Sequence, residues 1–529
     1  MPGWNLADVF EAVVDAVGPH EAVVGDHGRS TFSDLDRRAN QLAHVLVSRG
    51  VGPGDRVGVQ LRNGQTYLEV MLAAFKLRAV PVNVHYRYTV EELAYLFTDA
   101  DLSVVVHEAD LADRVRAAAT SAGLGLQAIA AGDEYEQALA GAPDHRPISS
   151  GGPRSGDDRY ILYTGGTTGM PKGVIWRHED LFLGALSGGN PGGDPPADLA
   201  AVATVARRAR TRCLPASPFT HGTAHWTALA TLLGGGCVVV SPAGALRPES
   251  LWDLVAAERV TLLVIVGDAF ALPLLDALDR EPDRWDLSAL LSVVSGGAVL
   301  SPTAHQGLLR HLPWSVVVDG YGTSETGGHG HMAVWPGQVP SGRPRFEVGD
   351  DTAVFDEHLE PVQPGSGAVG HLARRGHIPI GYHNDPERTA RTFPVIRGER
   401  WAVPGDLAVV EADGRVALLG RGSSSINSGG EKVFPDEVEA TLKSHPDVFD
   451  ALVVGTPDER WGEVVTAIVQ PRAGTHPAPD DLVEHCRAHL AGFKAPRRIV
   501  FVPSVVRRSS GKPDYGWARA VVAGDAVAG

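Results

Sequence analysis

The chain has 529 residues, of which 43% are hydrophobic and 21% charged, and it contains three cysteines. A chain of this length is too long to fold around a single hydrophobic core, so we expect two or more domains. The composition is typical of a globular protein. A formal net charge of −16 excludes a general nucleic-acid binder and a protein held to anionic membranes by charge.

The cysteines and the N-terminal segment predict a cytoplasmic location. Cys213, Cys237 and Cys486 have no motif spacing, which favours a reducing compartment without a disulfide framework. The first 18 residues carry acids within their apolar stretch and lack a basic leader, so they do not resemble a signal peptide. No apolar run reaches membrane-spanning length, so we expect no membrane span.

The first hundred residues alternate between helical and strand-like patterns. Leu35, Ala39, Leu42 and Leu46 share one helical face, and Gly50 is placed to end that helix. The predicted order is helix 33–49, strand 55–61, helix 66–77, strand 79–84, helix 91–98 and strand 103–108. This alternation predicts an α/β fold with a largely parallel sheet.

Residues 163–174, YTGGTTGMPKGV, form a strip of small residues between the apolar runs 160–163 and 173–176. That pattern predicts a strand, a tight loop and a second strand. Lys172 is followed by Gly173, so the strip is not a Walker-type loop. Dense backbone N–H groups and hydroxyls suit a phosphate chain, and we interpret the strip as a phosphate cradle rather than a flexible linker.

The rest of the chain continues in short units. The Pro/Gly-rich stretch 187–198 is predicted to be a surface loop, and strands are expected at 237–241, 261–267, 291–297 and 315–320. The region 343–420 predicts a β-rich subdomain. After the small-residue strip 420–430, the pattern restarts with helix 436–445, strands 450–457 and 463–471, helix 480–490 and strand 498–504, which is enough for a separate α+β domain.

Five strips now occur in order: YTGGTTGMPKGV, DGYGTSETG (319–327), VPGD (403–406), GRGSSSINSGGEKVFPDEVE (420–439) and SSGKPDYGWA (509–518). Together they make the chain resemble the adenylate-forming superfamily of acyl-CoA synthetases, adenylation domains and luciferases. The resemblance implies a large N-terminal domain, 1–421, and a small mobile C-terminal domain, 422–529. It also implies that a carboxylate attacks the α-phosphorus of ATP, in the presence of Mg²⁺, and that a thiol, usually of CoA, then displaces AMP.

By this resemblance, the nucleotide site draws on several strips. The residues expected to bind ATP or AMP are Thr164, Gly165, Gly166, Thr167, Thr168, Gly169, Lys172, Gly296, Gly297, Ala298, Asp319, Gly320, Tyr321, Gly322, Thr323, Ser324, Asp406 and Arg421. Among them, Tyr321 would stack on adenine, with a core tyrosine as the alternative. Asp406 would accept both ribose hydroxyls, a task that suits a carboxylate.

The resemblance also implies the catalytic, metal and CoA sites. The catalytic residues would be Lys512, Glu325, Thr168 and His221, with Glu325 as the Mg²⁺ ligand, because hard carboxylate oxygens suit that ion. Lys512 would bridge the α-phosphate and the carboxylate, where a cation stabilises developing negative charge. The acid and CoA would meet His221, Trp226, Gly429, Gly430 and Lys432. For His221 a structural role stays open, and for Trp226 and Phe270 core packing is an equal alternative.

Two departures from the family pattern concern the hinge and the ribose. Ser423 and Ser424 stand where a charged hinge residue and an acid are usual, and Pro404 precedes Gly405 and Asp406 in place of threonine. We expect the hinge at Ser423.

Three reactions fit these strips. The chain looks closest to actinobacterial fatty-acid and steroid side-chain acyl-CoA ligases, which favours an ATP-dependent acid–CoA ligase. The alternatives are an ATP-dependent diazotase that activates nitrite for an aryl amine, and adenylation for a carrier-protein thiol. A non-catalytic binding module is disfavoured by the retention of Lys172, Glu325, Asp406 and Lys512. The partner would be a small-molecule acid, whose identity the sequence does not specify. The sequence is also compatible with a homo-oligomer.

Overall fold

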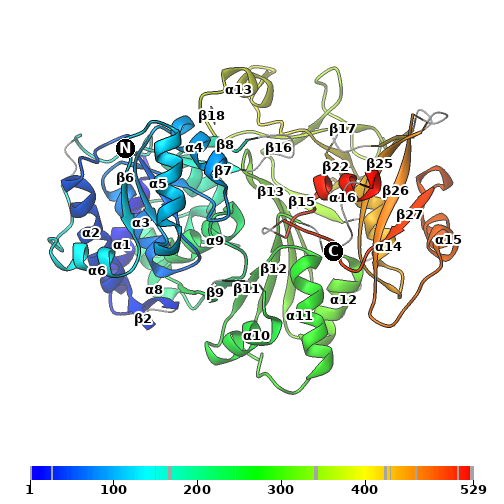
Figure 1. Cartoon of the computed structure of the whole chain (residues 1–529), viewed down its shortest axis with the longest axis horizontal. Helices are drawn as coiled ribbons and strands as arrows, with labels where there is room; N and C mark the ends of the chain where they lie inside the picture. Colours follow the sequence, from blue (N-terminus) through cyan, green and yellow to red (C-terminus); the bar gives the residue numbers. More distant parts are fainter. Residues whose placement is uncertain are drawn as a thin grey trace.

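The computed structural model describes residues 3–25, 28–148, 151–164, 170–242, 244, 246–298, 300–338, 344–421, 426–428, 431–458, 462–508 and 511–524. In this part of the chain the strands form two large sheets, one smaller C-terminal sheet and a short ribbon. Figure 1 shows the N-terminal helices at one end of the molecule and the C-terminal elements at the other, beside α11 (Asp268–Arg280) and α12 (Pro302–His311).

The first large sheet has seven strands in the order β18-β8-β7-β4-β3-β5-β6. Its strands are β3 (Arg56–Gln60), β4 (Val80–Asn83), β5 (Leu102–His107), β6 (Gln127–Ala130), β7 (Arg159–Thr164), β8 (Lys172–Arg177) and β18 (Gly381–Tyr382). The pairs from β6 to β7 are parallel, as predicted, whereas β8 is antiparallel to both of its neighbours. The two strands expected on either side of the 163–174 strip are therefore confirmed as β7 and β8, whereas residues 165–169 between them lie outside the described residues.

The predicted helices of this region also form, with ends fixed by their flanking residues. They are α2 (Phe32–Ser48), α3 (Gln65–Lys76) and α4 (Val90–Asp99). The structure also contains α1 (Leu6–Val17), α5 (Ala112–Ser121) and α6 (Asp133–Ala140), which were not predicted. Thr31 and Asp34 form a reciprocal capping box at the start of α2. Gly50 follows its end with φ of +85°, a conformation that glycine adopts without strain.

The second large sheet has thirteen strands, in the order β16-β17-β21-β22-β15-β14-β13-β12-β11-β9-β10-β1-β2. Its first strands along the chain are β1 (Glu21–Gly25), β2 (Gly28–Thr31), β9 (Arg212–Pro215), β10 (Cys237–Val239), β11 (Leu262–Ile265), β12 (Ser292–Gly296) and β13 (Val316–Thr323). Its later strands are β14 (Gly327–Val334), β15 (Arg345–Val348), β16 (Thr352–Phe355), β17 (Val369–Arg374), β21 (Asp406–Val410) and β22 (Val416–Arg421). The predicted β-rich subdomain at 343–420 thus extends this sheet through the β14–β15 pairing.

The remaining elements of the N-terminal part cover and connect the sheets. They are α7 (His178–Asp180), α8 (Leu199–Arg208), α9 (Gly222–Leu233), α10 (Pro248–Ala257), α13 (Pro386–Thr392) and the ribbon β19 (Val395–Ile396) with β20 (Glu399–Arg400). The stretch 187–198 contains one short 3₁₀ turn before α8 begins, in keeping with the predicted loop.

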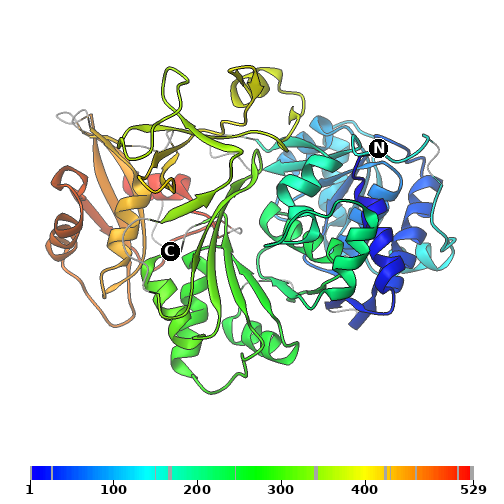
Figure 2. The ribbon, with the colours of Figure 1, turned by 180° about the vertical axis from the view of Figure 1, so that it is seen from behind.

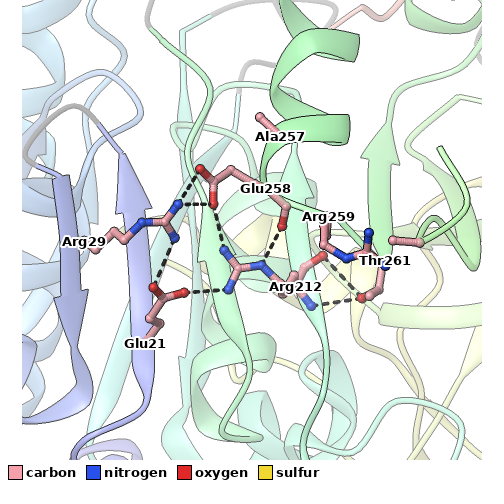
Figure 3. A pocket seen from close by; sticks show the side chains of 8 residues that line it. Glu21, Arg29, Arg212, Ala257, Glu258, Arg259 and Thr261 are labelled. Atoms are coloured by element: carbon pink, nitrogen blue, oxygen red, sulfur yellow. Dashed lines mark hydrogen bonds and ion pairs between the residues drawn. The ribbon is translucent and has the colours of Figure 1, made fainter. Parts of the chain in front are cut away.

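A ring of ion pairs joins the β1–β2 hairpin to β9 and to the residue after α10 (Figure 3). Arg29 and Arg212 each pair with both Glu21 and Glu258, at N–O distances of 2.7–3.0 Å. The Arg212 hydrogen bond, with a smaller one from Arg29, keeps the pKa of the Glu21 carboxyl below its usual value despite the opposing effect of burial. Each arginine and each glutamate of the ring has partners of opposite charge within it. We therefore interpret the ring as a structural feature that links the β1–β2 edge of the sheet to β9 and the end of α10.

The C-terminal part forms its own sheet, in the order β24-β23-β26-β25 with β27 added beside β26. Its elements are β23 (Ile426–Ser428), β24 (Glu431–Val433), α14 (Pro435–Lys443), β25 (Val448–Asp458), β26 (Gly462–Pro471), α15 (Pro479–His489), β27 (Arg498–Phe501) and α16 (Tyr515–Ala523). Two clusters of buried residues between 426 and 522 form its core. In Figures 1 and 2 these elements lie together, apart from the N-terminal helices. The expected hinge around Ser423 lies outside the described residues.

Candidate active site

The phosphate strip is held at both ends by β7 and β8. Thr164, the last residue of β7, pairs directly with Lys172, the first residue of β8. A side chain on Gly173 would place its Cβ 2.8 Å from Cγ2 of Ile161 and 2.9 Å from the ring of Tyr163, so packing requires glycine there. The loop predicted to hold phosphates, Gly165, Gly166, Thr167, Thr168 and Gly169, lies outside the described residues. The structure therefore describes the two strands on either side of this loop, including Lys172 at the start of β8.

We expect Lys172→Met to raise the KM for ATP by about 10-fold or more while leaving the melting temperature of the free protein almost unchanged. A charge-assisted hydrogen bond contributes about 1.5–3 kcal/mol, and Lys172 is half-buried at the strand end, outside the hydrophobic clusters. Initial rates against ATP concentration and a thermal melt check both parts. A large fall in melting temperature would instead favour a structural turn.

The loop with Glu325 is a tight turn between β13 and β14. Within it, Thr326 Oγ1 accepts from Thr323 N at 3.1 Å, and Thr323 Oγ1 accepts from Glu325 N at 3.2 Å. A Cβ on Gly322 would lie 2.2 Å from the carbonyl oxygen of Gly327, so the backbones approach closely only because glycine stands there. The turn thus holds the Glu325 backbone rigidly, with its side chain half-buried.

Three side chains tie this turn to the first sheet and to β17. The Trp176 indole, on β8, donates to the carbonyl oxygen of Ser324 at 3.1 Å. The Tyr382 hydroxyl, on β18, donates to Glu325 Oε1 at 2.7 Å. Arg374 donates to the carbonyl oxygen of Thr326 at 2.6 Å and also to that of Gly328. Glu325 is thereby attached to the same strand that leaves the phosphate loop.

The donor set around Glu325 fits Mg²⁺ bound together with a nucleotide. No cationic side chain among the described residues forms an ion pair with this carboxylate, and Oε2 accepts no described hydrogen bond. The described residues also contain no cluster of three or more His, Cys, Asp or Glu side chains able to hold a metal alone. Mg²⁺ is commonly held by one or two carboxylates, substrate phosphates and waters, so a single open carboxylate beside a phosphate loop suits it.

Lys512 lies at the end of β12, against the glycine pair that was predicted to face the nucleotide. Gly297 has φ of +88°, and a Cβ built there would lie 3.2 Å from Lys512 Cε and 3.8 Å from its Nζ. A Cβ on Gly296 would lie 3.0 Å from Thr223 Cγ2. Gly297 thus leaves the space that the lysine side chain occupies, and the structure brings together two strips that are more than 200 residues apart.

The Lys512 turn is anchored on both domains. Arg508 N donates to the carbonyl oxygen of Lys512 at 3.0 Å, and Arg507 pairs with Asp450 through two 2.7 Å hydrogen bonds. A Cβ on Gly511 would lie 3.0 Å from the Phe270 ring and 3.1 Å from the carbonyl oxygen of Val266. The turn therefore rests on the loop between β11 and α11. Phe270, considered as a pocket liner, is 8% exposed and contacts this turn.

Glu439, on α14, is buried in the C-terminal part, and its burial predicts that the stability of the fold depends on pH. Glu439, 4% exposed, accepts from Val453 N at 2.9 Å and from the Tyr515 hydroxyl at 3.2 Å. Desolvation, aided by the neighbouring Asp436 carboxylate, raises the pKa of Glu439 to about 7 from 4.5. The folded state therefore binds more protons than the unfolded state between these values, so stability is lost as the pH rises from 4.5 to 7.

Glu439→Gln should remove that loss. Glutamine keeps the accepting oxygen but carries no charge, so we expect it to stabilise β25 and β26 at pH 8 by about 2 kcal/mol and to have little effect at pH 5. Amide hydrogen exchange of these strands, read at both pH values, checks this expectation. Equal effects at pH 5 and pH 8 would contradict it.

His221 is a neutral imidazole facing the same region. Its Nε2 is buried without a hydrogen-bond partner among the described residues, and its ring centroid lies 5.3 Å from that of His85. Burial lowers the pKa of His221 to about 3, with smaller contributions from His85 and from Lys512. The charge of Lys512 thus acts on His221, and an uncharged nitrogen is available at the site at neutral pH.

The two candidate ribose residues lie opposite each other at the end of the second sheet. Asp406 begins β21 and pairs in register with Arg421, the last residue of β22. Asp406 is 7% exposed, and Gly405 before it has φ of +99°, where glycine is favoured. The side chain of Arg421 lies outside the described residues.

Both oxygens of the Asp319 carboxylate have partners among the residues that follow β12. Its Oδ2 lies 3.0 Å from His305 Nε2, and its Oδ1 accepts from Leu300 N at 3.1 Å. At 1% exposure, the side chain is buried at the middle of β13. The backbone of the strand then continues to the half-buried candidates, which are Gly320, Tyr321, Thr323 and Ser324.

Some of the remaining candidates pack against neighbouring side chains, and the others lie outside the described residues. Tyr321 lies against His329 and Phe346, with ring centroids 5.5 and 5.8 Å away. Trp226 donates to the Tyr160 hydroxyl at 3.1 Å and packs edge-on against Trp176. Ala298 accepts from Ser295 Oγ at 2.8 Å through its carbonyl. The CoA candidates Gly429, Gly430 and the Lys432 side chain lie outside the described residues.

Sequence reasoning missed the residues that hold the site together. Tyr382, Trp176 and Arg374 were not identified, although the GYH triplet at 381–383 follows an apolar run and carried a usable signal. The contacts that reveal their roles join residues 46 to 148 positions apart. Such pairings become visible only when the strand order is known.

Comparison with known proteins adds the family. The model of the AMP-binding enzyme family matches residues 10–381, and that of the AMP-binding enzyme C-terminal domain matches residues 437–512. The chain belongs to the AMP-binding enzyme family. It is an ATP-dependent, adenylate-forming acid–CoA ligase, which uses ATP with Mg²⁺ and takes CoA as co-substrate.

Individual relatives match along almost the whole chain. A 3-oxocholest-4-en-26-oate–CoA ligase of Rhodococcus rhodochrous is 41% identical, over 97% of this chain and 95% of its own. A medium/long-chain-fatty-acid–CoA/3-oxocholest-4-en-26-oate–CoA ligase of Mycolicibacterium smegmatis is 42% identical, over 98% and 96%.

A solved structure places the fold in the same family. ATP-bound MatB of Rhodopseudomonas palustris, 26% identical over 98% of this chain and 99% of its own, superposes with a TM-score of 0.81, and its apo form with 0.73. This acyl-CoA-synthetase-type ligase therefore has the expected α/β architecture with a small C-terminal domain. None of its described helices is long and apolar enough to cross a membrane.

Proposed function

We propose that this ligase joins CoA to a hydrophobic carboxylic acid of the steroid side-chain or fatty-acid kind, in the cytoplasm. The resemblance of the whole chain to ligases named for such acids supports the substrate class. The seating of Lys512 against Gly297 is the observation that carries the mechanism. Nothing in the comparisons favours nitrite activation.

In the first half-reaction, an oxygen of the acid attacks the α-phosphorus of ATP, and the bond to pyrophosphate breaks. Lys172 and the strip after Thr164 would hold the β- and γ-phosphates, and Asp406 with Arg421 would hold the ribose. Glu325 would hold Mg²⁺, which when bound supplies charge neutralisation to the phosphates. Lys512 would stabilise the charge that develops between acid and α-phosphate.

In the second half-reaction, the CoA thiol attacks the acyl carbon, AMP leaves and the thiol proton is released. His221 would line the tunnel by which the thiol arrives, as a neutral group that adds no repulsion. We further propose that residues 422–529 rotate between the two steps at the strip around Ser423, which would remove Lys512 and bring Gly429, Gly430 and Lys432 toward CoA.

The test is pyrophosphate and AMP release with ATP, Mg²⁺ and a panel of acids, each measured with and without CoA. We expect the highest kcat/KM with long-chain fatty acids or a 3-oxo steroid bearing a side-chain carboxylate, with acyl-CoA as product. Preference for small aromatic acids would overturn the substrate class. Turnover only with nitrite and an aryl amine would overturn the proposed acid–CoA ligation itself.

A further inference from the structure

Neighbouring residues fix the backbone on both sides of Glu325, and one described hydrogen bond, from Tyr382, restricts its side chain. Its backbone is fixed on one side by Trp176, through Ser324, and on the other by Arg374, through Thr326. The side chain itself has three rotatable bonds, and fixing a glutamate costs up to about 2 kcal/mol of conformational entropy. The described hydrogen bond that restricts the carboxylate comes from the Tyr382 hydroxyl, at 2.7 Å from Oε1.

We propose that Tyr382 is a positioning residue, which holds the Glu325 carboxylate so that Oε2 faces the metal and the phosphates. The inference rests on the metal role proposed for Glu325. A hydrogen bond to an ionised group contributes about 1.5–3 kcal/mol, which is enough to select one rotamer. Because Oε1 is engaged by the hydroxyl, Oε2 is the oxygen left for Mg²⁺.

The location of Tyr382 makes this position rigid. Tyr382 pairs with Val174 on β8, two residues beyond Lys172, and His383 N donates to the carbonyl oxygen of Gly173 at 2.7 Å. Its ring lies 6.0 Å from that of Phe393, and the Arg388 guanidinium lies 5.5 Å from its centroid. The hydroxyl therefore moves with the strand that frames the phosphate loop, and it sets the metal ligand relative to the phosphates.

The proposal contrasts with a second interpretation of the same bond. If the hydroxyl competed with the metal for the carboxylate, its removal would strengthen Mg²⁺ binding. If it positions the carboxylate, its removal weakens Mg²⁺ binding. The sign of the effect therefore decides between them.

The test is Tyr382→Phe, which removes the hydroxyl and keeps the ring contacts. We expect the Mg²⁺ concentration for half-maximal pyrophosphate release to rise about 10-fold, with little change in thiolysis of a supplied acyl-adenylate, which needs no ATP. Independently of activity, calorimetry measures the Kd of ATP with Mg²⁺ and with EDTA. The tightening of ATP binding by Mg²⁺ should shrink by the same factor in the variant.

Tyr135→Phe is the matched control, because it removes the same kind of bond elsewhere. The Tyr135 hydroxyl donates to Glu69 Oε2 at 2.6 Å in a fully buried setting. We expect this variant to lower the melting temperature and to leave the Mg²⁺ dependence of ATP binding unchanged. A general loss of rigidity would change both variants alike, and that result would overturn the positioning role.

Glu325→Gln separates this proposal from the proposed function. If Glu325→Gln leaves the Mg²⁺ dependence intact, the metal role of Glu325 is wrong and the inference about Tyr382 falls with it. If Glu325→Gln weakens Mg²⁺ binding but Tyr382→Phe does not, only the positioning role is wrong. In the double variant, we expect no further loss beyond Glu325→Gln, since both act through one carboxylate.

Discussion

Lys512→Ala should lower the rate of pyrophosphate release by about 100-fold or more, while thiolysis of a supplied acyl-adenylate stays close to the wild-type rate. Removing one preorganised charge from a developing anion typically costs about 10²–10³-fold in rate. The Lys512 side chain lies against Gly297, so in the proposed mechanism its charge would be next to the acid and the α-phosphate. In the proposed second half-reaction the thiol attacks the acyl carbon after Lys512 has rotated away, so this lysine would not serve the charge that the departing AMP gains.

The two half-reactions are measured separately, as pyrophosphate release in one assay and acyl-CoA formation from synthetic adenylate in the other. Arg519→Ala, which removes an exposed cation from α16, is the control and should affect neither rate. An equal loss of both half-reactions in Lys512→Ala would contradict the assignment, because it would mean that the substitution had damaged the domain or its movement.

The local elements of this protein could be predicted from sequence because their signals are local. The face of Leu35, Ala39, Leu42 and Leu46 predicts helix α2 to within one residue at each end, and the apolar runs at 160–163 and 173–176 predict β7 and β8. The sequence motifs also identified Lys512 and Gly297 separately, as members of different strips.

What could not be predicted is how distant strips meet. The contact between the Asp319 carboxylate and His305, fourteen residues earlier, was not predicted, and the expected nucleotide role of the strip remains a prediction. The β-rich subdomain was predicted, but its attachment was not: His331 pairs with Glu347, which joins β15 to the rest of the second sheet, and Phe346 pairs with Val416 within the subdomain. These pairings depend on strand order, which no local pattern encodes.

A buried ion pair across the two domains was also invisible in the sequence. Lys443, at the end of α14, lies with its Nζ 2.7 Å from Asp268 Oδ2 at the start of α11. The two side chains are 12% and 1% exposed, and the other oxygen of Asp268 accepts from Ser301 N at 2.8 Å. Despite its burial, Asp268 has a pKa below its usual value because of the Lys443 charge.

We expect Lys443→Met to slow pyrophosphate release by about 100-fold and to leave thiolysis of supplied adenylate unchanged or faster. Removing one partner of a buried pair costs about 3–5 kcal/mol, because the remaining charge stays desolvated. If the C-terminal part rotates as proposed, moving it away relieves that cost, because Asp268 is then rehydrated. The penalty therefore falls on the arrangement that holds Lys512 against Gly297, as a shift in population rather than as unfolding.

Lys494→Met is the matched control, because its Nζ pairs with Glu437 Oε2 at 2.8 Å entirely within the C-terminal part. That variant loses a pair of similar length and burial without crossing the domains, so it should leave the ratio of the two half-reaction rates unchanged.

Asp268→Asn removes the same pair from the other side while keeping the oxygen that Ser301 N needs. If the pair holds the adenylation arrangement, Asp268→Asn and Lys443→Met must both lower the ratio of pyrophosphate release to thiolysis, and the double variant must lower it no further than the stronger single one. If each instead reduces both rates together and the losses add, the pair stabilises the fold alone, and the position of Lys512 is set by the Arg507 and Asp450 contacts within its own domain.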